Sequence, residues 1–108
     1  MAYAGQYQNA MAVLNAADNQ NDPRILNYKG FTNRKIGNID VAMDFYKRAI
    51  ALDADYVLAR SYMGQGYITL GDRDAAMREL DEIEARVGKE DWAYVSLAKA
   101  LKGEATNY

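Results

Sequence analysis

One stretch of this chain occurs twice, first at residues 28–43 and again at residues 62–77. The first copy reads YKGFTNRKIGNIDVAM, and the second reads YMGQGYITLGDRDAAM. We call the shift that carries the first copy onto the second the repeat offset. A fixed internal period predicts stacked copies of one supersecondary unit, because neighbouring copies bury a shared apolar face. The identical pairs are Tyr28 and Tyr62, Gly30 and Gly64, Gly37 and Gly71, Asp40 and Asp74, Ala42 and Ala76, and Met43 and Met77.

The first copy is predicted to form two helices joined by a turn. Asp22 and Pro23 are expected to start the first helix, because Asp caps helix N-termini and Pro suits the first helical turn. Gly37 ends this helix by allowing a left-handed backbone conformation. Asn38 or Asp40 then caps a second helix, whose apolar residues recur at helical spacing.

The second copy is predicted to repeat this arrangement. Asp53 or Asp55 is expected to start its first helix, and Gly71 with Asp72 forms the turn. A second helix follows over about residues 73–87, and no segment of the chain alternates as a strand would.

The two ends of the chain each resemble half a copy. Residues 5–17 carry the apolar stripe of a second helix, and residues 90–103 carry that of a first helix. Trp92 either packs into the core or stands exposed as an anchor for a partner. The sequence therefore predicts a single all-α domain of about six helices. Its parts are a half repeat over 1–21, repeats over 22–55 and 56–88, and a terminal helix over 89–103.

Composition excludes several classes of function. The chain has no cysteine and no histidine, so disulfides, thiolate metal sites and the commonest general base are absent. A net charge of −2 gives no overall attraction to nucleic acid. The apolar runs are too short to span a membrane. The acidic residues of 79–86 are interpreted as a solvated helix surface, so we expect no enzyme activity, cofactor or metal.

The period, the paired helices and the recurring small residues together resemble the tetratricopeptide repeat family. Lys29 and Arg60 depart from the family pattern, which usually has apolar residues there. The resemblance implies an all-α, right-handed superhelix of tandem helix-turn-helix repeats. The matching residues are Leu26, Gly30, Gly37, Ala42, Tyr46 and Ala49 in the first copy, and Met63, Gly64, Tyr67, Gly71, Ala76, Leu80 and Ile83 in the second.

Gly30 and Gly64 recur inside the predicted first helices, where glycine costs about 1 kcal/mol relative to alanine. Their recurrence at one slot predicts a close approach between helices. We expect each glycine to lie against the pattern alanine of the second helix, Ala42 or Ala76.

The resemblance also implies a concave face, lined by the first helices, that binds a peptide or a partner helix. In this interpretation arginines pair with carboxylates, amides bond to the partner backbone and aromatic rings contact apolar side chains. The family's two-carboxylate clamp is not expected, because Asn27 and Phe31 occupy its Lys and Asn slots. The predicted partner-binding residues are Arg24, Asn27, Phe31, Arg34, Lys35, Ser61, Tyr62 and Gln65.

Charge is divided unevenly between the helices. Residues 23–36 contain four basic residues and no acid, whereas residues 74–87 contain five acids and two basic residues. The basic helix favours an acidic partner segment. The alternative is that its basic side chains simply solvate an exposed helix.

A scaffold that assembles with itself is the rival hypothesis. A half repeat exposes an apolar face near Met11 and Leu14, and open-ended repeats tend to stack. The chain also resembles small bacterial members of the family, which are often exported to the periplasm. Residues 1–10 show neither the basic start nor the apolar core of a signal peptide, so the sequence leaves periplasm and cytoplasm open.

Overall fold

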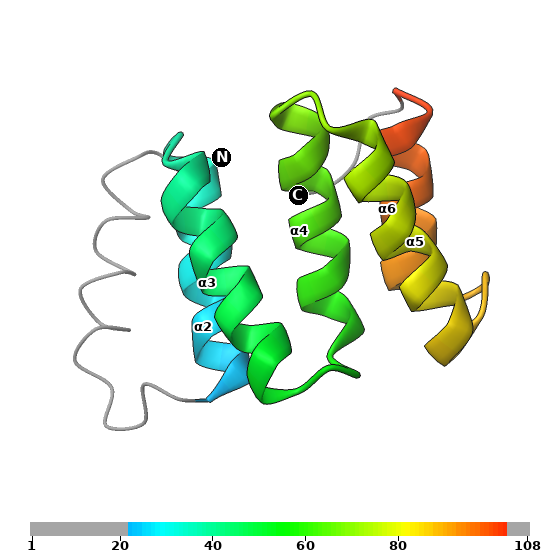
Figure 1. The fold of residues 1–108 in the computed structure, drawn as a ribbon, viewed down its shortest axis with the longest axis horizontal. Helices are drawn as coiled ribbons and strands as arrows, with labels where there is room; N and C mark the ends of the chain where they lie inside the picture. Colours follow the sequence, from blue (N-terminus) through cyan, green and yellow to red (C-terminus); the bar gives the residue numbers. More distant parts are fainter. Residues whose placement is uncertain (1–21, 104–108) are drawn as a thin grey trace. The chain divides into compact units, whose positions relative to one another are not determined.

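The computed structural model describes residues 22–103, which form five helices and contain no strand (Figure 1). The all-α class predicted from the sequence is thus confirmed. The helix expected over residues 5–17 lies outside the described residues. The helices are α2 (Pro23–Lys35), α3 (Ile39–Leu52), α4 (Val57–Thr69), α5 (Arg73–Val87) and α6 (Trp92–Leu101).

The chain divides into two compact units between residues 54 and 55. In the first unit, α2 and α3 pack side by side as a helical hairpin. In the second unit, α4, α5 and α6 all pack against one another. The core of this second unit is a cluster of buried apolar residues from α5 and α6, namely Ala76, Leu80, Ile83, Ala93, Leu97 and Leu101.

The two helix-ending glycines behave as the sequence predicts. Gly37 and Gly71 have φ angles of +93° and +82°, in the left-handed region. The N–H group of Asn38 donates to the carbonyl oxygen of Asn33 at 2.8 Å, closing the end of α2. The same bond recurs one repeat offset later, from Asp72 to the Tyr67 carbonyl at 2.8 Å. Both turns are Schellman motifs, so the sequence period reproduces one backbone structure.

Aspartates cap three of the helices: Asp22 caps α2, Asp72 caps α5, and Asp91 caps α6 by accepting a hydrogen bond from the Ala93 N–H at 2.9 Å. The carboxylate of Asp22 accepts a hydrogen bond from the Arg24 N–H at 2.9 Å, and Asp72 accepts one from the Ala75 N–H at 3.0 Å. Asn38 is the residue preceding α3, but its side chain makes no capping hydrogen bond to that helix.

The predicted start of α4 was wrong. This helix begins after Tyr56, not at Asp53 or Asp55, and no side chain caps it. The carboxylate of Asp55 instead accepts a hydrogen bond from Nε of Arg86 at 2.9 Å, near the end of α5. The carboxylate of Asp55, which the local sequence predicted as a helix cap, is therefore bound by an arginine that is distant in the sequence.

The helix-interior glycines do sit at close approaches, but against partners other than those expected. A Cβ built on Gly30 would lie 2.5 Å from Cε1 of Tyr46 on α3. One built on Gly64 would lie 2.6 Å from Cδ2 of Leu97 on α6. The nearest neighbours are thus large buried side chains rather than the pattern alanines. Each glycine makes room for a bulky residue that fills the core.

Candidate partner-binding surface

One side of α2 carries a stripe of four residues that we call the α2 stripe: Arg24, Tyr28, Phe31 and Lys35. Their spacing of four, three and four places them within about 60° of one another around the helix. Gly30, which faces α3, projects from a different side of α2. The α2 stripe is therefore not used to pack α2 against α3.

The middle of the α2 stripe is aromatic and open. The Tyr28 side chain is 56% exposed, and Phe31 is partly buried. Their ring centroids lie 6.1 Å apart with the planes tilted by 51°. Neighbouring rings of this kind offer a large contact area at low entropic cost, which is why aromatic residues are enriched at protein interfaces.

Two cations surround the ring of Phe31. The guanidinium carbon of Arg34 lies 5.8 Å from the ring centroid, and Nζ of Lys35 lies 5.4 Å from it. Partial burial, and then the charge of Arg34, lower the pKa of Lys35. The ion pairs of the described residues do not include Lys35. Lys35 therefore presents a positive charge beside the ring of Phe31.

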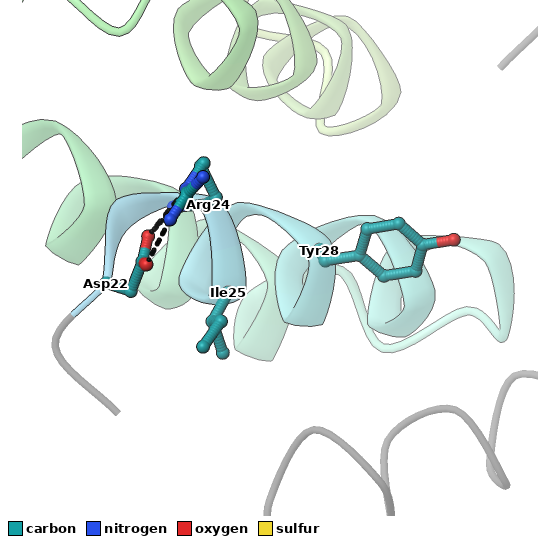
Figure 2. A pocket seen from close by; sticks show the side chains of 4 residues that line it. All are labelled: Asp22, Arg24, Ile25 and Tyr28. Atoms are coloured by element: carbon teal, nitrogen blue, oxygen red, sulfur yellow. Dashed lines mark hydrogen bonds and ion pairs between the residues drawn. The ribbon is translucent and has the colours of Figure 1, made fainter. Parts of the chain in front are cut away.

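The other end of the α2 stripe is closer to neutral. Nη2 of Arg24 lies 2.9 Å from Oδ2 of Asp22, and hydrogen bonds from Arg24 lower the pKa of Asp22. Figure 2 shows this pair beside Ile25 and the outward-standing ring of Tyr28. These four residues line an open hollow of about 330 Å³. The Arg24 side chain is 80% exposed, so the ion pair is weak and exchangeable.

The second unit carries the repeat equivalent of this surface. Moving the α2 stripe by one repeat offset gives Leu58, Tyr62, Gln65 and Thr69 on α4, and a further step takes Leu58 to Trp92 on α6. The rings of Tyr62 and Trp92 meet edge to face, with centroids 6.4 Å apart. The sequence left open whether Trp92 packs in the core or lies at the surface. Trp92 is 51% exposed and lies at the surface, against Tyr62.

Three of the predicted partner-binding residues are buried. Asn27, Ser61 and Gln65 all lie beneath the surface. The Ser61 hydroxyl donates to the carbonyl oxygen of Ala93 at 2.8 Å and so ties α4 to α6. Asn27 Oδ1 accepts no hydrogen bond from the part of the chain that the structure describes. Partner contacts of these three residues stay predictions.

The structure thus groups some predicted residues and adds others. Arg24, Phe31, Arg34 and Lys35 share one region of α2, as the helical spacing predicted. Trp92, weighed in the sequence as a core residue or an exposed anchor, was not among the predicted partner-binding residues, although the repeat offset places it in the slot of Arg24 and Leu58. The sequence indicates this position only when the repeat offset is applied once more, from the second full repeat to the terminal helix. Met11 and Leu14, invoked for self-assembly, lie outside the described residues.

The described residues include no group of three or more acidic, His or Cys side chains able to hold a metal ion. Among the same residues, no helix has the length and apolar character that crossing a bilayer requires. Both surfaces offer aromatic contact, and the surface on α2 also offers positive charge.

Comparison with known proteins agrees with the repeat structure. The family described as "Tetratricopeptide repeat" matches residues 36–103. A solved structure described as the crystal structure of MamA is similar in fold, with a TM-score of 0.75 and 24% sequence identity. The match covers 92% of this chain and 60% of the MamA chain, so our chain spans less than two thirds of that protein.

A comparison with curated proteins finds no match. Repeats of this kind generally serve as non-catalytic scaffolds for protein interactions, and the paired helices and matching turns of this chain are of that kind. The chain belongs to the tetratricopeptide repeat family.

Proposed function

We propose that this protein is a binding module that holds a segment of a protein partner against the exposed faces of its first helices. The observation that carries the proposal is the pairing of open aromatic rings at repeat-related positions. Tyr28 and Trp92 are exposed, and each contacts a partly buried ring, Phe31 in the first unit and Tyr62 in the second. Aromatic residues at the surface are typical hot spots of protein interfaces.

The α2 stripe favours an acidic partner segment. Arg34 and Lys35 bracket Phe31, and α2 contains no acidic residue. A segment that places a carboxylate beside an apolar side chain would pair with Lys35 and contact the ring of Phe31 together.

Selection from a displayed peptide library, followed by calorimetry on the selected peptides, tests this proposal. We expect enrichment of acidic sequences with an interspersed aromatic or aliphatic residue. Arg34→Glu should abolish binding of these peptides while the helical circular dichroism survives. Arg78→Glu, the same charge reversal at an exposed position of α5, is the matched control and should bind normally. Equal affinity of the Arg34→Glu and wild-type proteins would contradict the assignment.

A further inference from the structure

We propose that the α2 stripe also binds the outer face of α5 from a second copy of this chain. This inference rests on the proposed function, because it uses the same stripe and names one partner for it. It differs from assembly through open repeat ends, since both surfaces are the sides of complete helices.

The outer face of α5 is acidic around an apolar centre. Asp74, Met77, Asp81 and Glu84 follow one another at spacings of three, four and three, so they share one side of the helix. We call these four residues the α5 acidic face. Asp74 and Asp81 are exposed, and Met77 is 45% exposed. Arg78 is an exposed basic residue beside this face, and Nζ of Lys89 lies 3.6 Å from Oε1 of Glu84, so Asp74 and Asp81 carry most of its negative charge.

The two surfaces match in length and in order of chemistry. The α2 stripe extends for about 16 Å along its helix axis, and the α5 acidic face for about 15 Å. Lys35 and Asp74, at one end of each surface, carry opposite charges, and the next residue along each surface is apolar, Phe31 and Met77. At the other end, Arg24 pairs with Asp22 and Glu84 with Lys89 within their own chain, so the charge complementarity lies mainly between Lys35 and Asp74. An antiparallel pairing would place Lys35 near Asp74, and Phe31 near Met77. Methionine sulfur packs favourably against aromatic rings.

Such a contact would be weak and sensitive to salt. One helix pair buries less than the roughly 1,200 Å² typical of stable interfaces, so we expect dissociation constants on the order of 100 μM. Exposed charges separated by more than about 10 Å are screened at about 0.1 M salt. The contact joins two different surfaces, so it either closes a ring or extends a chain of copies.

Sedimentation velocity on the whole chain tests the inference. Between about 10 μM and about 1 mM protein at low salt, the weight-average mass should rise with concentration, and added NaCl should reverse the rise. A mass of one chain at every concentration and salt would overturn the proposal. So would an association that is unaffected by salt.

Charge reversal identifies the surfaces. Lys35→Glu and Asp74→Lys should each weaken self-association about tenfold or more, because each sets like charges against one another. Mixing the two variants should restore association, since each then offers the other a complementary surface. Lys47→Glu, an exposed reversal on α3, is the control and should associate as wild type. Failure of the mixture to associate would overturn the proposal.

Two further outcomes keep the inference separable from the proposed function. If selected peptides bind the wild-type protein but no self-association occurs, only the second-copy proposal fails. If neither occurs, both fail. Should Asp74→Lys lose its helical circular dichroism, Asp74→Asn removes the same charge from its pairing with Lys35 and should still weaken self-association; unchanged association of Asp74→Asn would overturn the proposal.

Discussion

Arg60 and Glu79 form an ion pair that joins α4 to α5, with Nη1 and Oε1 2.9 Å apart. Their side chains are only 10% and 14% exposed. Arg60 occupies a slot where tetratricopeptide repeats usually carry an apolar side chain. In the second unit the largely buried guanidinium of Arg60 is therefore stabilised by the carboxylate of Glu79 from the neighbouring helix.

We predict that Glu79→Ala destabilises the protein by about 3 kcal/mol, because it leaves the Arg60 guanidinium without that carboxylate in a largely buried place. The double replacement Arg60→Met with Glu79→Leu should be as stable as wild type or more so, since both desolvation costs disappear. Urea unfolding of wild type, of the single variants Arg60→Met and Glu79→Leu, and of the double variant measures the coupling between the two residues. Asp81→Ala, an exposed acid on the same helix, is the control. A loss from Glu79→Ala no larger than the control's would contradict the prediction.

The first unit also has a buried cation, Lys29, but an aromatic ring lies beside it where the second unit has a carboxylate. Lys29 is buried, and its Nζ lies 5.7 Å from the ring centroid of Phe45. Phe45 precedes Glu79 by one repeat offset, so the two residues occupy equivalent slots of the repeat. Burial, and then the charge of Arg48, lower the pKa of Lys29. The same position thus carries an aromatic face for one cation and a carboxylate for the other.

The lowered pKa of Lys29 predicts a pH dependence of stability. The folded state penalises the charged amine, and this penalty is complete below the lowered pKa. It is relieved as the pH rises from that value to the ordinary 10.5. Lys29→Met should therefore be more stable than wild type near neutral pH, by about 1 kcal/mol, with the difference shrinking as the pH approaches 10.

Urea unfolding of both proteins at matched pH values measures this difference. Burial raises the pKa of Tyr67, which removes stability at alkaline pH, but this effect is common to both proteins and cancels. A difference that is constant with pH, or that grows toward pH 10, would show that Lys29 does not titrate as inferred.

Much of the fold could be predicted because the residues that begin and end helices recur at the same positions in both copies of the repeat. The bounds of α5 were predicted at 73–87 and lie at Arg73–Val87. Gly37 and Gly71 were recognised as helix ends because their left-handed conformation is a local requirement. The start of α4 was missed because Arg86, distant in sequence, binds the carboxylate of Asp55.

The candidate surface was predictable to a similar extent. Helical periodicity alone places Arg24, Phe31 and Lys35 on one side of α2. Periodicity does not reveal that Asp22 already binds Arg24, or that Ser61 is committed to the Ala93 carbonyl. Those bonds depend on how side chains and helices meet, and a single stretch of sequence does not contain that information.

Gly30→Ala is predicted to destabilise the protein although alanine favours helices. The helix propensity gain is about 1 kcal/mol, whereas overpacking a core typically costs about 1–3 kcal/mol. The new methyl group would meet the fully buried Tyr46 ring, so we expect a net loss of about 1 kcal/mol. The second unit has Leu80 in the slot of Tyr46, so Tyr46→Leu is the natural compensating change.

The compensating change gives this prediction its control. In the Tyr46→Leu background, Gly30→Ala should cost less than in wild type, because the ring that opposes the methyl group is gone. Thermal unfolding followed by circular dichroism measures both differences. Strictly additive effects of the two substitutions would mean that the Gly30–Tyr46 contact does not limit the side chain at position 30.

Trp92 offers a direct spectroscopic test of the second-unit surface, because it is the single tryptophan of the chain. Its indole is half exposed and meets Tyr62 edge to face. Tyr62→Ala should therefore shift the emission maximum to longer wavelength, as water replaces the ring. Tyr28→Ala, in the other unit, is the control and should leave the emission unchanged. A peptide bound across this surface should shift the wild-type emission to shorter wavelength. If Tyr62→Ala leaves the emission as it is in wild type, the two rings do not form the contact on which this surface depends.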